Sequence, residues 1–175
     1  MHRHFFRLLF VALFFAGCSV APLETPQSEI GRLSTLLIAL DKQNSKKESE
    51  ALARDIFAQT SKLTKAFRLT SPPLWHNFLV NIGLRKKGLC FHWSDALYVH
   101  LKQKRYKSFS FHLVGANVGE YFREHNALVV VSKNGKVEDG VIIDPWRDSG
   151  KLYFSKVKDD KAYVWEHRLD RGCSP

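Results

Sequence analysis

Apolar side chains in the N-terminal half of the chain recur with the three- and four-residue spacing of amphipathic helices. One such stretch covers residues 30–40 and a second covers residues 52–67, with the polar run 41–48 between them. The sequence Ser71-Pro72-Pro73 follows, and the residue before a proline disfavours helical backbone. The pattern therefore predicts two helices that end before these prolines.

A third helix is predicted from about Gly88 to about Lys104. Its apolar stripe steps by three and four residues, so its members share the face that turns toward the core. The stripe consists of Cys90, Trp93, Leu97 and Leu101. Cys90 is thus expected in the first turn of this helix, on its buried-facing side.

After Lys107 the pattern changes to that of β-strands. Five segments rich in β-branched and aromatic residues are separated by Gly, Asn, Asp or Ser. They are SFSFHLV, HNALVVV, GVIID, KLYFSKV and AYVWEHRL. Helices first and strands afterwards predict an α+β fold, in which N-terminal helices pack on an antiparallel sheet.

Length and composition favour one folded domain. The chain has 175 residues, of which 45% are hydrophobic and 13% aromatic, and this content argues against disorder and low complexity. Lys and Arg number 27 against 17 Asp and Glu, a formal charge of +10. The surplus is scattered, so a solvated basic surface facing anionic lipid or wall polymers is a better interpretation than nucleic-acid binding.

The first residues have the features of a bacterial export signal. Arg3 and Arg7 precede an apolar run that is too short for a spanning helix, and Ala16-Gly17 stand directly before Cys18. The ending Phe15-Ala16-Gly17-Cys18 resembles the lipobox of bacterial lipoproteins, although Phe15 replaces the usual Leu. The resemblance implies cleavage after residue 17 and lipid on the sulfur of Cys18, with membrane lipid as a partner; an ordinary cleaved signal and a retained apolar anchor are the alternatives.

Processing at this position divides the chain into three parts. Residues 1–17 are the signal, residues 18–28 carry the lipid and form a tether, and residues 29–175 form the domain. The mature chain keeps 25 Lys and Arg against 17 acids, a charge of +8. Ser19 after the lipidated cysteine resembles the sorting signal for the outer membrane, so we expect a lipid-anchored protein that faces the periplasm.

Cys90 has the setting of a reactive thiol. A helix N-terminus stabilises a thiolate through its backbone N–H groups and the helix dipole, and three cations, Arg85, Lys86 and Lys87, lie just upstream. In an oxidising compartment Cys90 has an alternative, a disulfide with Cys173, which would remove the nucleophile. Cys90 as an inert buried thiol is a further alternative.

A base and its orienting group are suggested by a predicted hairpin. Asn134-Gly135 is a strong signal for a two-residue turn, and if these two residues form it, Lys133 faces Lys136 and His125 faces Asp144. Opposed side chains in a sheet lie close enough for an imidazole–carboxylate hydrogen bond, although a bulge near Gly140 would change the register. The alternatives are a core histidine at position 125 and an Asp-Pro turn at position 144.

Cys at a helix start, His opening an apolar strand, and Asp ending the next strand resemble the transglutaminase-like branch of the papain-like fold. The resemblance covers about residues 74–146 and implies a Cys90–His125–Asp144 triad of nucleophile, proton carrier and orienting carboxylate. Transglutaminases usually have Trp directly after the Cys, where this chain has Phe91. The G-D-C pattern of related bacterial peptidases is also missing from GLCFHWSD.

Other polar residues are secondary candidates. An oxyanion donor is expected from the backbone N–H of Cys90 and from a side chain such as Asn77 or His76. His112 is an alternative base, but no hairpin Asp faces it. The spacing of Cys90, His92 and His100 does not match a structural zinc site, and no cofactor or metal is implied.

These features together predict a membrane-anchored thiol enzyme that cleaves or transfers an amide or peptide bond in a protein or peptide substrate, with hydrolysis favoured. Two alternatives stay open, a cell-wall hydrolase acting on stem peptides and an inactive lipid-anchored binding or scaffolding module. The sequence leaves the substrate and the oligomeric state undetermined.

Overall fold

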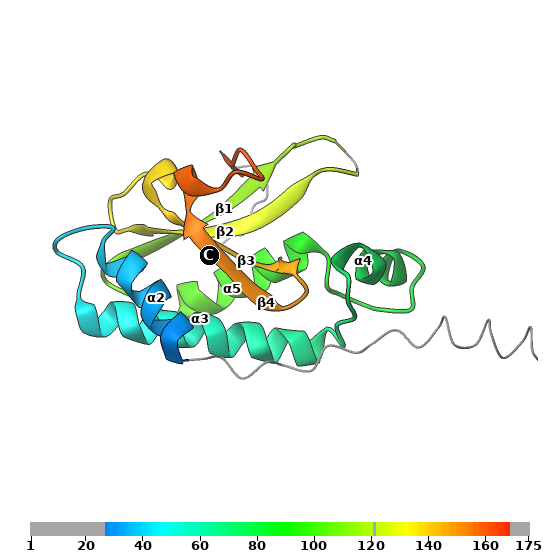
Figure 1. Ribbon diagram of the computed structural model, residues 1–175, viewed down its shortest axis with the longest axis horizontal. Helices are drawn as coiled ribbons and strands as arrows, with labels where there is room; N and C mark the ends of the chain where they lie inside the picture. Colours follow the sequence, from blue (N-terminus) through cyan, green and yellow to red (C-terminus); the bar gives the residue numbers. More distant parts are fainter. Residues whose placement is uncertain (1–26, 121, 169–175) are drawn as a thin grey trace, which may run out of the picture.

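The computed structural model describes residues 27–120 and 122–168 (Figure 1). Four features named above lie outside the described residues: the predicted signal, the predicted lipidation site Cys18, nearly all of the predicted tether, and Cys173. Within this part of the chain the helices are α2 (Gln27–Ile38), α3 (Lys46–Ala66), α4 (Pro73–Asn81) and α5 (Cys90–Lys104). The strands are β1 (Phe109–Ala116), β2 (His125–Ser132), β3 (Val141–Asp148), β4 (Lys151–Lys156) and β5 (Glu166–His167), with short 3-10 turns η1 (Val137–Asp139) and η2 (Val157–Asp159).

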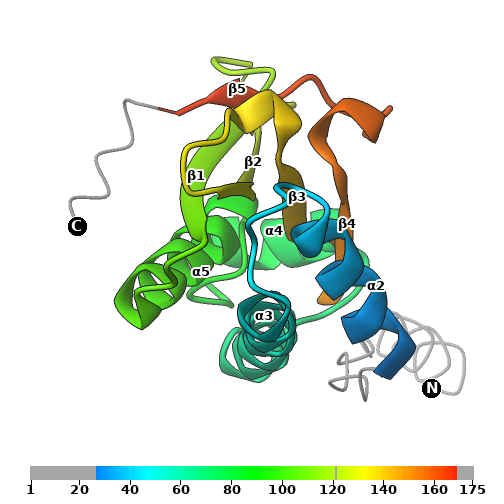
Figure 2. The same cartoon turned by 90° about the vertical axis from the view of Figure 1, so that its left-hand side faces the viewer.

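The α+β fold class is confirmed. The five strands form one antiparallel sheet in the order β4-β3-β2-β1-β5, so consecutive strands β1 to β4 are neighbours and β5 returns to the edge beside β1. Helices α2, α3 and α5 lie on one side of this sheet (Figure 2). The α5 helix packs against β1, β2 and β3, which fixes its N-terminus relative to those strands.

Alternate residues of β2 point into two separate apolar clusters, as strand geometry requires. Leu128 and Val130 join the main core beneath the helices. Val129 and Val131 join a smaller cluster on the opposite face, which Trp165 and other half-buried side chains partly cover. Every residue from His125 to Val131 is therefore buried, and β2 is the central strand of the fold.

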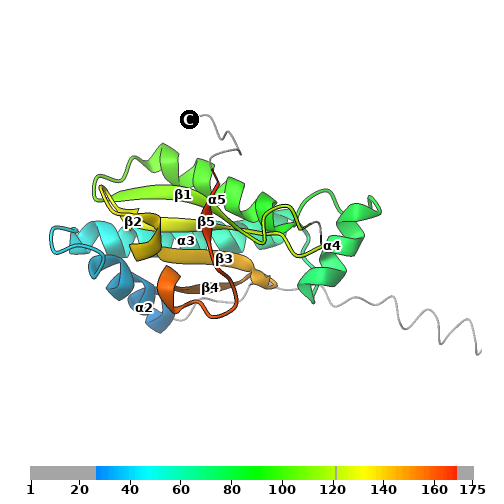
Figure 3. The same ribbon diagram turned by 90° about the horizontal axis from the view of Figure 1, so that it is seen from above.

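Helix α4 was not predicted from the sequence. The two prolines that end the preceding helical pattern also open this helix, with Pro72 as N-cap and Pro73 in the first turn. Proline is tolerated there because the N–H it lacks has no partner inside a helix and its fixed φ suits helical backbone. The views in Figures 1 and 3 place α4 at one end of the molecule, near the loop between β1 and β2.

The register of the predicted hairpin was wrong by two residues. Leu128 pairs with Ile143 and Val130 pairs with Val141, because residues 137–139 form a 3-10 turn between the strands and Asn134-Gly135 do not close a two-residue hairpin. A shift of one residue would have moved His125 and Asp144 to opposite faces. A shift of two keeps them on the same face as diagonal neighbours.

A buried histidine fixes the segment that leads into Cys90. The N–H of Thr70 donates to Nδ1 of His76, and Nε2–H of His76 donates to the carbonyl of Lys87 at 2.9 Å. Gly88 follows with φ of 128°, and a Cβ on it would overlap the imidazole of His76. The close approach of this backbone to His76 therefore requires glycine.

We expect Gly88→Ala to lower the free energy of unfolding by about 1–3 kcal/mol, because the new side chain meets both an unfavourable φ and the ring of His76. Urea denaturation at constant m-value measures the change. Gly31→Ala is the matched control: Gly31 lies in α2 with open space around it, so alanine should stabilise the protein by about 0.5–1 kcal/mol. Equal effects at the two positions would contradict this account of residue 88.

Candidate active site

Cys90 is the first residue of α5 and carries a free, partly exposed thiol. Two side chains of the same helix hold the preceding turn in place. Nδ1 of His92 accepts the N–H groups of Gly88 and Leu89 at 3.2 and 3.1 Å, and Nε1–H of Trp93 donates to the carbonyl of Gly88 at 3.1 Å. The sulfur is thus fixed at the positive end of the helix dipole, where a thiolate is stabilised.

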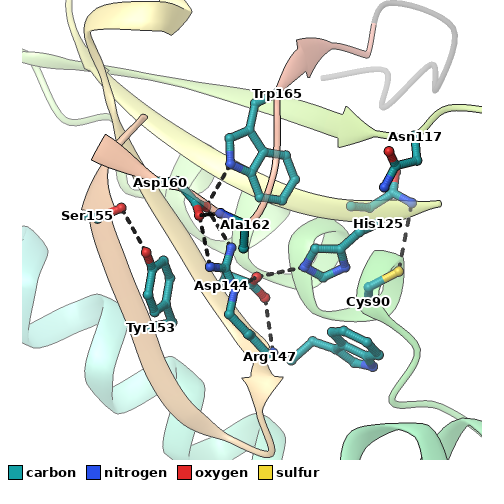
Figure 4. Close-up of polar contacts among 12 residues, drawn as sticks. Cys90, Asn117, His125, Asp144, Arg147, Tyr153, Ser155, Asp160, Ala162 and Trp165 are labelled. Carbon is teal, nitrogen blue, oxygen red and sulfur yellow. Dashed lines mark hydrogen bonds and ion pairs between the residues drawn. The ribbon is translucent and has the colours of Figure 1, made fainter. Parts of the chain in front are cut away.

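His125 and Asp144 form a buried hydrogen bond. Nε2–H of His125 donates to Oδ2 of Asp144 at 2.7 Å, and the two side chains are only 2% and 1% exposed. By strand alternation both lie on the sheet face opposite the helices, with the smaller apolar cluster. The imidazole lies between this carboxylate and Cys90 (Figure 4), so the structure brings the three predicted residues together.

The other ring nitrogen of His125 is the one available to the sulfur. Nδ1 is buried and has no hydrogen-bond partner of ordinary geometry among the described residues. Cys90 is nevertheless coupled to the ring electrostatically. A proton on Nδ1 can therefore be exchanged with the thiol or with a substrate, while Nε2 stays bound to Asp144.

The two pKa shifts favour a thiolate–imidazolium pair. Burial by itself raises the pKa of Cys90, but His125 and the N–H groups of Asn126 outweigh it, so the pKa of the thiol lies below its ordinary value. Burial likewise lowers the pKa of His125, but Asp144 and the Cys90 thiolate raise that pKa to about 9. The pair is charged at a pH above the pKa of the thiol and below about 9.

Asp144 has a second ionic contact, with the guanidinium of Arg147. Nε of Arg147 donates to Oδ2 of Asp144 at 3.0 Å, and the two terminal nitrogens of Arg147 bind both oxygens of Asp160 at 3.1 and 2.7 Å. The guanidinium also lies over the ring of Tyr153, 3.8 Å from its centroid. Four charged groups, His125, Asp144, Arg147 and Asp160, therefore form one continuous network on the face of β3.

Aromatic side chains cover the imidazole. The rings of Trp146, Tyr163 and Trp165 lie 4.7, 4.6 and 5.4 Å from the ring of His125, centroid to centroid. Trp165 also donates from Nε1 to Asp160 at 3.0 Å, so the C-terminal segment is fixed to the same network. These rings exclude water from the His125–Asp144 hydrogen bond, which strengthens it.

Asn126 is a site residue that sequence reasoning missed. Its Nδ2 lies 3.8 Å from the Cys90 sulfur and 3.3 Å from an oxygen of Glu124. Its Oδ1 lies 3.4 Å from a nitrogen of Arg168. Strand alternation puts the side chains of His125 and Asn126 on opposite faces of the sheet. Only the position of Asn126 next to His125 in the sequence could therefore have suggested it. Both reach Cys90 because α5 begins beside the end of β2.

The secondary candidates have other roles. His76 uses both ring nitrogens for Thr70 and Lys87, so its prediction as an oxyanion donor was wrong. Asn77 accepts Nε1–H of Trp146 at 3.0 Å, which links α4 to the ring above His125. His112 lies beside His167, with Nδ1 and Nε2 3.2 Å apart, and takes no part in the network around Cys90.

Among residues 27–120 and 122–168, no group of three or more His, Cys, Asp or Glu side chains is arranged to hold a metal ion. No helix in the same part of the chain combines the length and apolarity that a membrane span requires. Comparisons with protein-family models, curated proteins and solved structures gave no match to this chain. The interpretation of the site therefore comes from its geometry.

We expect Cys90 to react with iodoacetamide well below the ordinary thiol pKa of about 8.5, because His125 stabilises the thiolate. Mass spectrometry of the Cys90 peptide, with alkylation rates taken across pH, gives the midpoint. Asp144→Asn should move that midpoint upward, since the imidazolium loses its carboxylate, whereas His112→Ala should leave it unchanged. A midpoint at or above 8.5 in the unmodified protein would refute the ion pair.

We expect Asp160→Asn to lower the free energy of unfolding by about 1–3 kcal/mol, because it leaves the partly buried Arg147 with one carboxylate. The pKa of Asp160 is lowered by Arg147 against the effect of burial, so its contribution is present above the ordinary carboxyl pKa and is lost as pH falls below it. Denaturation across pH should therefore show the difference shrinking below about pH 4. Asp139→Asn, at an exposed ion pair with Lys158, is the control and should change stability by less than about 0.5 kcal/mol.

Proposed function

We propose that this protein is a thiol enzyme of the transglutaminase-like type, with a papain-like core, that breaks or transfers an amide bond. The observation that carries the proposal is the alignment of Cys90, His125 and Asp144, with the carboxylate 2.7 Å from one ring nitrogen and the sulfur on the other side of the ring. A thiol nucleophile with an adjacent proton carrier, itself oriented by a third group, is the arrangement that covalent acyl transfer requires.

In the first half of the reaction, the Cys90 thiolate attacks the carbonyl carbon of the substrate and forms the C–S bond. Negative charge moves to the carbonyl oxygen. His125 then gives its Nδ1 proton to the nitrogen of the leaving amine, and the C–N bond breaks. The products of this half are a free amine and a thioester on Cys90, with His125 neutral and still bound to Asp144.

In the second half, neutral His125 takes a proton from water as the oxygen attacks the thioester. The C–S bond breaks, a carboxylic acid leaves, and the thiolate–imidazolium pair is restored. An amine in place of water gives a transferred amide instead. We favour hydrolysis, since water is always available while an amine acceptor requires a binding site of its own.

The oxyanion is best served by two groups beside the sulfur. The backbone N–H of Cys90 belongs to the first turn of α5, where helix N–H groups lack intrahelical acceptors. Nδ2 of Asn126, 3.8 Å from the sulfur, is the nearest side-chain donor that the contacts provide. Donors fixed before the reaction stabilise developing charge without a reorganisation cost.

The proposal includes a cellular setting. Export and lipidation at Cys18 place the domain in the bacterial cell envelope, facing the periplasm and anchored in the membrane, with the outer membrane favoured by Ser19. The substrate is then a protein, a peptide or the stem peptides of the cell wall.

The test is turnover of a proteome-derived peptide library by the purified full-length protein in ¹⁸O-labelled water. Hydrolysis should place the heavy oxygen in new C-termini, and transfer should join an added amine to the acyl fragment. Cys90→Ala should abolish both, and Asp144→Asn should lower kcat by about 10⁴-fold, because the imidazole loses its orientation. His112→Ala is the matched control and should retain full activity.

Purified sacculi form the second arm of the test. Release of stem-peptide fragments that depends on Cys90 would identify the cell wall as the substrate. Activity that survives Cys90→Ala, or no turnover in either arm by a protein that folds normally, would overturn the enzymatic proposal in favour of a lipid-anchored binding module.

A further inference from the structure

The strongest unexplained surface feature is the apolar face of α4 and the turn that follows it. Leu74, Phe78, Ile82 and Leu84 are 70%, 47%, 51% and 63% exposed. They account for four of the eight large hydrophobic residues that the described chain exposes. A contiguous apolar group of this kind marks an interaction surface, since scattered single residues are the norm.

The rest of the fold covers little of this face of α4. Of the nine residues of α4, only His76 and Leu79 are buried. Trp75 stacks on Phe78, with ring centroids 5.2 Å apart, so two aromatic rings lie together on the helix. In Figures 1 and 3 the helix projects beyond the end of the sheet, away from α2.

Positive charge flanks the apolar face on both sides in the sequence. From Ile56 to Ser94 the chain contains no Asp or Glu. The same stretch contains six cations, Lys62, Lys65, Arg68, Arg85, Lys86 and Lys87. Nε of Arg85 donates to the carbonyl of Arg68 at 3.1 Å, so the segments before and after α4 are joined at this basic region. This part of the chain therefore combines exposed apolar side chains with positive charge and has no acidic residue of its own.

An anionic lipid surface has the complementary chemistry. Helices that lie in the membrane interface bury aliphatic and aromatic side chains among the upper acyl chains and place Lys and Arg at the headgroup phosphates. Each cation near an anionic leaflet adds to the attraction. The predicted lipid on Cys18 would also keep the domain close, because only eight residues lie between Cys18 and the start of α2, and the connection reaches about 30 Å at most.

We propose that α4 and residues 82–87 form a membrane-interface segment that lies on a bilayer containing anionic phospholipid. Leu74, Phe78, Ile82 and Leu84 enter the acyl-chain boundary, and Lys86 and Lys87 contact the phosphates. This inference does not depend on Cys90 being a nucleophile, since the residues that carry it take no part in the triad.

The segment also orients the candidate active site. Lys87 is three residues from Cys90, and Asn77 of α4 contacts Trp146 above His125. The loop between β1 and β2 lies at the same end of the molecule (Figure 3), and its residues Val118 and Phe122 are exposed. This orientation, unlike the membrane contact itself, rests on the proposed function, and it gives Cys90 a substrate held at the lipid surface.

The experiment measures tryptophan fluorescence of the full-length protein, reconstituted in vesicles whose lipid is brominated on the upper part of the acyl chain. Bromine quenches tryptophan at short range, so quenching reports contact with lipid. The intact mass of the sample first establishes whether Cys18 carries lipid. We expect quenching in vesicles with phosphatidylglycerol that Trp75→Phe largely removes and Trp165→Phe does not.

Surface variants separate the two components of the proposal. Phe78→Ser with Ile82→Ser changes only exposed positions and should reduce the Trp75 quenching severalfold while circular dichroism stays unchanged. Lys86→Glu with Lys87→Glu should reduce it in phosphatidylglycerol vesicles only. Cys90→Ala should be quenched like the unmodified protein, which keeps this inference separate from the catalytic proposal.

Two outcomes would overturn the proposal. If Trp75→Phe leaves the quenching unchanged, the apolar face does not touch lipid and belongs to a protein or peptide partner. If quenching is the same in vesicles of phosphatidylcholine alone, the cations do not contribute and the anionic surface is refuted.

Discussion

The arrangement of the surrounding residues depends on the buried hydrogen bond between His125 and Asp144, because the charges of this pair must be stabilised away from water. Removing a charged pair from water costs several kcal/mol for each ion, and the cost is recovered only where the remaining polar atoms are also satisfied. Arg147 and Asp160 provide the remaining hydrogen bonds, because the guanidinium of Arg147 binds the carboxylates of Asp144 and Asp160. The imidazole, whose pKa is raised to about 9, can then stay protonated at neutral pH and favour the thiolate form of Cys90.

The same network explains why the C-terminal segment crosses the sheet face. Tyr163 and Trp165 pack on the ring of His125, and the indole N–H binds Asp160. The short strand β5 then joins the edge of the sheet beside β1. The aromatic contacts that exclude water from His125 and Asp144 therefore also fix the position of the end of the described chain. Stability and reactivity of the site depend on the same residues.

Local patterns predicted the parts of the fold that local physics determines. Helical spacing located three of the helices, and the change of period after Lys107 located the strands of the sheet. A contact between His125 and Asp144 was predicted from a turn that does not form as expected. The two residues are diagonal neighbours and do not face each other directly, but the contact forms because an error of two residues preserves the face of every side chain in a strand. An even shift of the register keeps the two side chains on the same face of the sheet, whereas an odd shift separates them. The prediction of the site therefore depended on whether the shift was even, and not on the exact pairing.

Long-range pairings were beyond the same reasoning. Arg147 meets Asp160 across 13 residues, and Asn77 meets Trp146 across 69, and neither contact has a periodic signal. Helix α4 was hidden because Pro72-Pro73 is equally compatible with the end of one helix and the start of another.

The residues that sequence reasoning missed are of two kinds, which differ in their exposure to solvent. Arg147 and Asp160 bury charge and fix it with bidentate bonds, so their geometry is rigid. Leu74 and Phe78 expose apolar surface near cations in the sequence, and this is the surface that we propose contacts an anionic bilayer. Because α5 begins three residues after Lys87, the rigid charge network and the exposed apolar face meet at Cys90. The proposed nucleophile and the proposed membrane-interface segment therefore lie close together in the chain.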